Sequence, residues 1–259
     1  MELTTPLQLV DVPWRNRGRV ARQIVVALSV EELRRIPPES RHCLREALSL
    51  GNAPRKDKES LNKILTAELL DNIPAKNLVM VEYQQGTIIK GSGDFVGKVR
   101  SQLDRIILLS IGRRLLQSLA QSGMTVTIVP SSRKSEARPD NYRAAIARGK
   151  VLKWRDESGK ERAIRGTGAG SDTTIRFNSD QTIIGTAEAW QQQPPEIWLG
   201  HELIHADDFA YGRMDPVQKD GIRNYERQAI GLPPFDQKEF TENKLRAEWS
   251  EPQPARPRY

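Results

Sequence analysis

Cysteine and histidine are rare in this sequence. Of its 259 residues, one is cysteine, Cys43, and three are histidine. A single cysteine excludes a framework of disulfide bonds within the chain and a zinc site built on cysteines. We therefore expect a protein that folds in a reducing compartment, and any metal site must draw on other ligands.

Long apolar runs are also missing. The longest, such as residues 24–28 and 106–109, are far shorter than the ~18 apolar residues that a membrane span needs. The first residues have no basic start and no long apolar core, and they include Glu2 and Asp11, so we expect no cleaved secretion signal. With 37% hydrophobic and 28% charged residues, the composition is that of a globular protein without a membrane partner.

The charge is unevenly distributed. The net charge is +7, and residues 131–165 contain eleven Lys/Arg against five Asp/Glu. Such a run is either a solvated loop region or a surface that attracts an acidic partner, and both interpretations stay open. No zinc-finger or RNA-binding aromatic motif accompanies the run, so we expect no nucleic-acid partner.

Turn residues and hydrophobic spacing divide the chain into two regions. We expect residues 1–93 to be a variable N-terminal region of short helices that ends in a hairpin over residues 77–92. Residues 94–259 are expected to form one α+β domain. Its elements are a long helix over 94–123, a strand over 124–130, a hairpin over 149–166, a strand over 172–178 and a helix over 194–210.

The last of these helices carries the motif His-Glu-x-x-His, as His201, Glu202 and His205. Positions i and i+4 of a helix stand one turn apart on one face, so both imidazoles can bind one ion. Glu202 points about 100° away and can reach a water beside the ion, which suits a general base next to a Lewis acid. The alternative is an ordinary, partly buried helix that carries two histidines by chance.

A catalytic zinc ion needs a third protein ligand and one open position. The metzincin pattern would place Gly at position 208 and His at position 211, where this chain has Asp208 and Tyr211. No histidine remains downstream, so the third ligand must be a carboxylate. Glu226 follows His205 by 21 residues, a spacing similar to that of gluzincins, in which a glutamate on the next helix completes the site. Glu242 is the alternative.

Two further features bear on this site. Asp208 lies three residues after His205, on the same helix face, and is a candidate to accept a hydrogen bond from a ligand histidine. The alternative for Asp208 is a solvated side chain. The strand over residues 172–178 is a candidate sheet edge on which an extended substrate adds as a further strand, or else an internal strand with no role in binding.

Several separated segments resemble, in the same order, the NleD family of type III secretion effectors, which are zinc metallopeptidases of bacterial pathogens. They lie between Gly166 and Tyr259 and read GTGAGSDTTIRFN, HELIHA, ERQAIG, TENKLR and a C-terminus close to Arg-x-x-Tyr. The resemblance implies a zincin-like fold, a Zn²⁺ cofactor and cleavage of host proteins; the studied members of the family cut stress-activated MAP kinases. It also implies injection into the host cell cytoplasm. We expect a monomer.

The spacing of Arg256 and Tyr259 is similar to that of an Arg-x-x-Tyr pair in clostridial neurotoxin proteases. There the pair stabilises the negative charge that develops on the carbonyl oxygen, and one donor of this kind is worth ~10²–10³ in rate. Arg256 and Tyr259 are therefore candidate transition-state stabilisers. The alternative is a frayed, proline-rich tail.

Together these features predict an α+β, zincin-like zinc endopeptidase. His201, His205 and Glu226 are the expected zinc ligands, and Glu202 is the expected general base. Two alternatives remain open: a non-enzymatic effector that binds a host protein through its basic surface, and a zinc hydrolase that acts on a non-peptide substrate.

Overall fold

The computed structural model describes residues 78–155, 159–183, 185 and 188–259, together with the single residues 33, 41, 44 and 64. The chain divides into two compact units, one of residues 1–78 and 154–162 and one of residues 79–153 and 163–259. The short helices expected before residue 77 fall outside the continuously described part of the chain. The larger unit contains all the candidate site residues.

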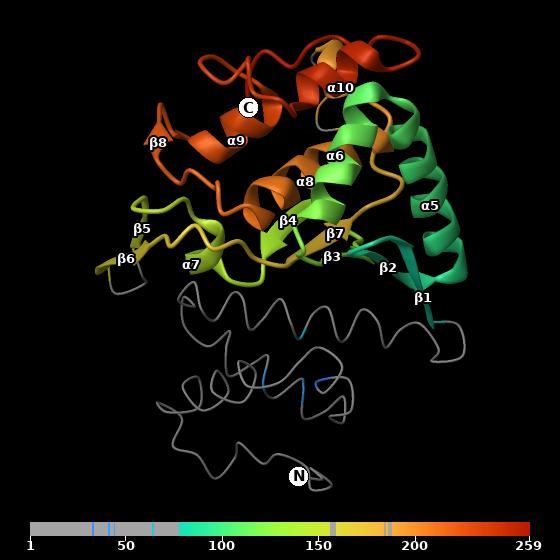
Figure 1. Ribbon diagram of the computed structural model, residues 1–259. Coiled ribbons are helices and arrows are strands. Elements are labelled where there is room, and N and C mark those ends of the chain that lie inside the picture. The colour runs from blue at the N-terminus through green and yellow to red at the C-terminus, as the bar shows by residue number, and fades with distance from the viewer. Residues whose placement is uncertain are drawn as a thin grey trace, which may run out of the picture. The chain divides into compact units, whose positions relative to one another are not determined.

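A five-stranded sheet forms one layer of the larger unit (Figure 1). Across the sheet its strands are β1 (Leu78–Gln84), β2 (Thr87–Ser92), β3 (Val126–Pro130), β7 (Thr173–Phe177) and β4 (Glu136–Pro139). The neighbours β2, β3 and β7 are parallel, whereas β4 runs antiparallel to β7. The expected hairpin is confirmed as β1 and β2, which form one side of this sheet.

One row of side chains crosses the sheet and faces its helical layer. Ile89 is opposite Ile128, Ile128 is opposite Ile175, and Ile175 is opposite Ala137. The three isoleucines are fully buried in one hydrophobic cluster, against which Ala137 packs. Because side chains alternate along a strand, a shift of one residue in any strand would turn this row to the other face.

Three helices supply most of the remaining core: α5 (Gly93–Leu108), α6 (Ser110–Gln121) and α8 (Pro195–Ala210). The single long helix expected over residues 94–123 is wrong, because Leu109 adopts an extended conformation (φ −73°, ψ 141°) that separates α5 from α6. The turn is tight. A Cβ atom on Gly112 would stand 2.0 Å from the carbonyl oxygen of Ile106, so only glycine fits there.

The remaining elements are short and complete a mixed α+β architecture, as expected. They are α7 (Tyr142–Ala145), the two-stranded sheet of β5 (Val151–Arg155) and β6 (Glu161–Arg165), η3 (Ala189–Gln191), the hairpin of β8 (Gln218–Lys219) and β9 (Ile222–Arg223), α9 (Asn224–Ile230) and α10 (Glu242–Glu248). Among the helices described, none is long and apolar enough to cross a membrane.

Helix α8 is buried along nearly its whole length, from Glu196 to Ala210. It begins with Pro195 in its first turn, where the missing N–H would have no helical partner. Gly200 lets α10 approach closely, since a Cβ atom there would lie 2.5 Å from the Leu245 side chain. The packing of α10 against α8 brings a second helix next to the His-Glu-x-x-His motif.

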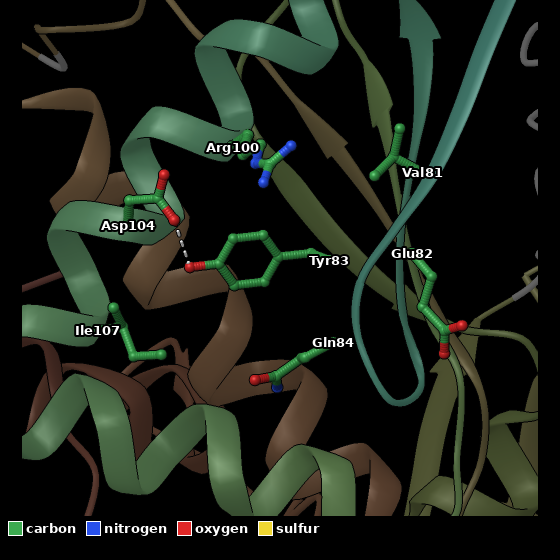
Figure 2. Close-up of a pocket in the computed structure, with 7 residues that line it drawn as sticks. All are labelled: Val81, Glu82, Tyr83, Gln84, Arg100, Asp104 and Ile107. Atoms are coloured by element: carbon green, nitrogen blue, oxygen red, sulfur yellow. Dashed lines mark hydrogen bonds between the residues drawn. The ribbon is translucent and has the colours of Figure 1, made fainter.

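A cavity of about 300 Å³ lies between β1 and α5, at the sheet edge opposite to β4 (Figure 2). The Tyr83 hydroxyl donates a hydrogen bond of 2.8 Å to Asp104 there. Burial and this hydrogen bond raise the pKa of Tyr83 above its ordinary value of 10.0. The cavity is lined by Val81, Glu82, Tyr83, Gln84, Arg100, Asp104 and Ile107.

The raised pKa of Tyr83 predicts a loss of stability in alkali. The folded state favours the protonated phenol, so Tyr83 contributes to the free energy of unfolding below pH 10. This contribution is lost as the pH rises above 10, because the phenol of the unfolded chain ionises first. We expect the difference in unfolding free energy between wild type and Tyr83→Phe to be constant up to about pH 9 and to shrink above about pH 10. Urea unfolding at several pH values measures it. A difference that stays constant to about pH 11 would contradict the assignment.

Candidate metal centre and active site

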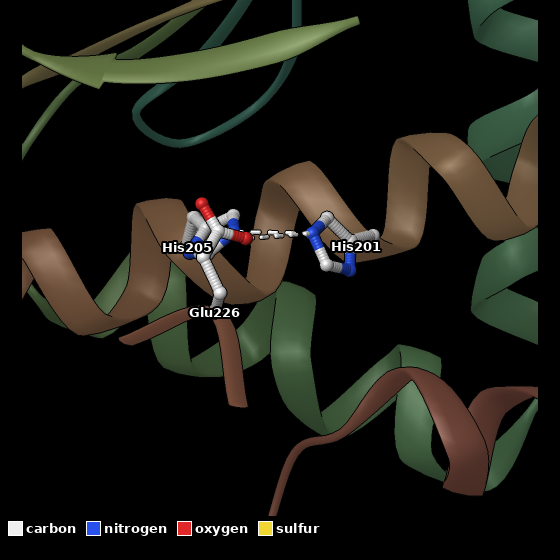
Figure 3. A group of neighbouring side chains, drawn as sticks. All are labelled: His201, His205 and Glu226. Carbon is white, nitrogen blue, oxygen red and sulfur yellow. Dashed lines mark hydrogen bonds and ion pairs between the residues drawn. The ribbon is translucent and has the colours of Figure 1, made fainter. Parts of the chain in front are cut away.

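Helix α8 holds His201 and His205 side by side, with their Nε2 atoms directed at one point (Figure 3). The two Nε2 atoms are 3.1 Å apart, and both residues are buried. The ring of His205 stacks on Phe209 at 5.9 Å and meets Tyr225 edge-on at 5.8 Å, so its orientation is fixed by packing. Two nitrogen atoms this close, away from water, require a proton or a cation between them.

Glu226, from α9, brings the third polar atom to this point (Figure 3). Its Oε2 atom lies 3.3 Å from Nε2 of His205 and 3.8 Å from Nε2 of His201. A tetrahedral zinc ion with bonds of roughly 2.0–2.1 Å holds its ligand atoms about 3.3 Å apart. The three observed separations therefore fit one triangular face of a zinc tetrahedron. Figure 3 shows the Glu226 carboxylate beside the two imidazole rings.

The electrostatics of the three groups favour a cation. Burial opposes charge on His201, but its bonds to Glu226 and Glu242 outweigh burial and raise its pKa to about 10. Burial would raise the pKa of Glu226, but His205 and His201 outweigh it and hold that pKa well below its usual range. Metal ions bind the deprotonated forms of these groups, so a divalent cation would replace the proton of His201 and pair with Glu226.

Glu202 is the buried carboxylate next to the two histidines. Burial raises its pKa, while His201, His205 and a hydrogen bond from the Ala137 N–H act in the opposite direction. Ala137 belongs to β4, so this carboxylate lies between α8 and the edge of the sheet. A raised pKa is what a general base needs in order to accept a proton and then release it near neutral pH.

The sheet edge beside α8 is β4, not β7. The prediction that residues 172–178 form the edge is wrong, because β7 is paired with β3 on one side and with β4 on the other. Strand β4 was not predicted from the sequence. Its four residues, Glu136–Pro139, include two charged residues and a proline, and they are too few to show an alternating apolar pattern.

Glu242 occupies the other side of His201. Its Oε2 atom lies 2.9 Å from Nδ1 of His201, and the fully buried carboxylate also contacts Arg246 at 2.7 Å and Arg256 at 3.1 Å. Burial would raise the pKa of Glu242, but His201 and the two arginines lower it to about 2. Glu242 thus faces Nδ1 of His201, whereas Glu226 faces Nε2. In metal sites, a carboxylate at the second ring nitrogen orients the histidine that binds the ion.

Asp208, expected to bond a histidine, has other partners. Its buried carboxylate pairs with Lys238 and lies 3.5 Å from Nε of Arg213. Nδ1 of His205 has no hydrogen-bond partner among the described residues. Buried charges need compensation, and at this end of α8 the cations Lys238 and Arg213 supply it. The carboxylate that lies beside a histidine of the motif is Glu242, and its spacing of four residues from Arg246 was the available sequence signal.

Asp215 fixes the loop that leads from α8 to α9. Its carboxylate accepts hydrogen bonds from the Val217 N–H and the Asn224 side chain, both 3.1 Å long. Its carbonyl oxygen accepts the N–H of Tyr225 at 2.9 Å. These bonds hold the first turn of α9, which carries Glu226. The sequence analysis did not identify Asp215, although an aspartate that bonds two residues ahead is a common turn former.

The C-terminal tail is anchored to α10. The side chain of Asn243 accepts the N–H of Arg256 at 2.7 Å and donates to its carbonyl oxygen at 3.1 Å. Arg246 donates to the carbonyl oxygen of Pro254 at 2.9 Å. The tail is therefore fixed by specific hydrogen bonds along residues 254–256 and is not frayed there.

This anchoring brings Tyr259 to the site. The Arg256 guanidinium contacts the Tyr259 ring at 5.2 Å while it bonds Glu242. Tyr259 is 53% exposed, and the partial burial of its phenol, together with the charges of Glu226 and Glu202, raises its pKa to about 12. The phenol thus lies within electrostatic reach of both carboxylates. Arg256 itself is engaged with Glu242, behind His201.

Comparisons with known proteins identify a family for this chain. The family model of peptidase M91, described as an effector protein, matches residues 84–259. No curated protein matches the chain. Similar solved structures include the catalytic domain of Clostridium botulinum neurotoxin serotype F, with 15% identity, a TM-score of 0.39 and coverage of 60% of this chain and 47% of that one. The light chain of the same serotype has 15% identity, a TM-score of 0.33 and coverage of 60% and 49%.

The chain thus spans about half the length of these two structures. The family match, in contrast, takes up more than half of the 259 residues and includes every candidate site residue. It confirms the resemblance to NleD-like effector peptidases. The chain belongs to the peptidase M91 family of effector proteins.

Proposed function

We propose that the chain is a zinc-dependent endopeptidase. His201, His205 and Glu226 hold the ion, and Glu202 is the general base. The observation that carries this proposal is the convergence of two imidazole nitrogens and one carboxylate oxygen, 3.1–3.8 Å from one another, beside a second buried carboxylate. Glu242, the alternative ligand, is instead proposed to orient His201 through Nδ1.

The chemistry follows from the positions of these groups. Zinc, when bound, would polarise the scissile carbonyl and lower the pKa of a water towards about 7. Glu202 accepts a proton from the water as the water oxygen bonds to the carbonyl carbon. Glu202 then gives this proton to the amide nitrogen as the C–N bond breaks, which leaves a carboxylic acid and an amine. Its buried position and raised pKa suit both transfers.

The substrate is proposed to lie along the open edge of β4. Alternate residues of an antiparallel strand bond to opposite neighbours. The Asp140 N–H bonds to Asp172 at 2.9 Å, on the β7 side, so Ala137 and Pro139 direct their main-chain groups to the open edge. Pro139 has no N–H, and the Ala137 N–H bonds Glu202, so the β4 groups open to a peptide there are the carbonyl oxygens of Ala137 and Pro139. An extended peptide would donate its N–H groups to these carbonyl oxygens, next to Glu202.

Tyr259 is proposed to donate a hydrogen bond to the carbonyl oxygen as negative charge develops on it. The raised pKa keeps the phenol protonated, as a donor requires. Arg256 is proposed to hold Tyr259 in place, because its guanidinium is bonded to Glu242 and to the carbonyl oxygen of Arg258. This modifies the sequence-based expectation, in which Arg256 itself was a candidate donor.

The biological setting is proposed from the family and the resemblance. Membership of an effector-protein family supports action inside a host cell, on a host protein. Delivery by the type III system and cleavage of stress-activated MAP kinases rest on the resemblance to NleD-like effectors. We propose that the protein acts as a monomer, since all the site residues belong to one chain.

The two glutamates are predicted to affect zinc differently. Glu226→Gln removes one of three ligands and should abolish stoichiometric zinc binding. Glu242→Gln leaves the ligands in place and should weaken affinity by about 10–100-fold, because only the support of His201 changes. Zinc content after dialysis against chelators of graded strength measures both. The opposite order of affinities would exchange the two assignments.

Glu202→Gln tests the reaction itself. The variant should keep its zinc and its fold but lose about 10²–10⁴ in cleavage rate, because the base is gone. Mapping of new protein termini in a host-cell lysate, treated with wild type or with Glu202→Gln, measures cleavage and locates the scissile bonds. A zinc-loaded wild type that cuts no protein would favour a docking protein or a hydrolase of another substrate class.

Tyr259→Phe tests the proposed transition-state donor. We expect kcat to fall by ~10²–10³ with little change in KM or zinc content. Tyr211→Phe is a matched control, because the Tyr211 hydroxyl donates to the carbonyl oxygen of Ser118 and not to the site. Full activity of Tyr259→Phe on the mapped substrate would remove Tyr259 from the mechanism.

A further inference from the structure

Exposed cations stand at both ends of β4. Arg133 and Lys134 precede the strand by two or three residues, and Arg143 and Arg148 follow it. All four residues are exposed, and none of them forms an ion pair with any residue that the structure describes. Other cations of this region already have acidic partners: Arg138 pairs with Glu136, and Lys150 pairs with Asp215.

The first pair of cations is held next to the start of β4. Ser135, the residue between them and the strand, is fixed by Gln181, which accepts its N–H at 3.0 Å and its hydroxyl at 3.2 Å. Burial lowers the pKa of Arg176, and the charge of Arg133 lowers it further, so Arg133 lies near the strand that pairs with β4. The contacts of Ser135 place the exposed Arg133 and Lys134 just before the first residue of β4.

The second pair of cations marks the other end. The segment after α7 is joined to the loop that follows α8, where Ile146 pairs with Met214 and the Ala147 N–H donates to the Met214 carbonyl oxygen at 2.9 Å. Arg143 and Arg148 lie on either side of this junction. The junction connects the segment after β4 to the loop between α8 and α9, the helix that carries Glu226.

We propose that these four cations select substrates in which acidic residues bracket the segment that lies on β4. This inference rests on the proposed function, because it places the substrate on that strand. Four residues of β4 cover about 13 Å at roughly 3.3 Å per residue, so the acidic groups should flank about four to six residues of an extended chain. Cations without acidic partners stand at both ends of β4. A bound segment with acidic residues at both of its ends would therefore be complementary to them in charge.

A protein segment fits this surface better than a nucleic acid. The open edge of β4 presents the main-chain carbonyl oxygens of Ala137 and Pro139, which accept hydrogen bonds from the N–H groups of an extended peptide but find no donor on a phosphate backbone. Exposed ion pairs are individually weak, so the preference should be modest, roughly tenfold for both ends together, and should decline at high salt.

Two labelled peptides of equal length test the proposal. In one, two aspartates stand at each end of a six-residue neutral segment, and in the other these four positions are asparagine. Binding to the Glu202→Gln protein is measured by fluorescence anisotropy, and cleavage is measured with wild type. We expect roughly tenfold tighter binding of the aspartate peptide at low salt and, for wild type, a roughly tenfold lower KM with similar kcat.

Charge reversal locates the two ends. The double variant Arg133→Glu/Lys134→Glu should lose the preference for aspartate at one end of the peptide only, and Arg143→Glu/Arg148→Glu should lose it at the other end only. The control is Arg113→Glu/Arg114→Glu on α6, which makes the same change in net charge and should keep the full preference.

The outcomes separate this inference from the proposed function. Equal binding of the two peptides by the Glu202→Gln protein overturns the inference, whatever wild type cleaves. Preferential binding of the aspartate peptide without cleavage by wild type supports the inference and contradicts the proposed function. A single-stranded oligonucleotide that displaces the aspartate peptide, and that no longer binds after both charge reversals, would overturn the proposal in favour of a nucleic-acid surface.

Discussion

The burial of α8 is the constraint on which the rest of the structure depends. This helix is buried from Glu196 to Ala210 and yet carries two histidines and four carboxylates. Isolated charges in such a place are costly, so each requires a partner. The neighbouring elements supply these partners: Arg105 for Glu196, Arg213 for Asp207, Lys238 for Asp208, the Ala137 N–H for Glu202, and Glu226 and Glu242 for His201.

The arrangement of the site follows from the way in which two later helices meet α8. Gly200 allows α10 to approach, and Glu242 at its start then reaches Nδ1 of His201. Helix α9 reaches Nε2 of the same ring through Glu226. The imidazole is thus held from both sides, which fixes its plane and its charge. The network that holds Glu242 also ties down the tail, because Arg256 bonds both Glu242 and the end of the chain.

Sequence reasoning located the motif helix and four of the five main strands because their signals are local. His201 and His205 are one helical turn apart, and the chain has few other residues that could replace them. The parts that it missed depend on contacts between distant segments. The short edge strand β4 is defined by its pairing with β7, and the break at Leu109 by the close approach of Gly112 to Ile106. Glu242, the partner of His201 at Nδ1, lies 41 positions downstream. The spacing of residues on α8 therefore favoured Asp208, which pairs with Lys238 instead.

The central claim is that one zinc ion is held by His201, His205 and Glu226. Crystals of the zinc-loaded Glu202→Gln protein, measured on both sides of the zinc absorption edge, test it most directly. The account predicts one strong anomalous peak at roughly 2.0–2.2 Å from both Nε2 atoms and from a carboxylate oxygen of Glu226, with Glu242 still at Nδ1 of His201. A peak coordinated by Glu242, or no peak between the two histidines, would contradict the account.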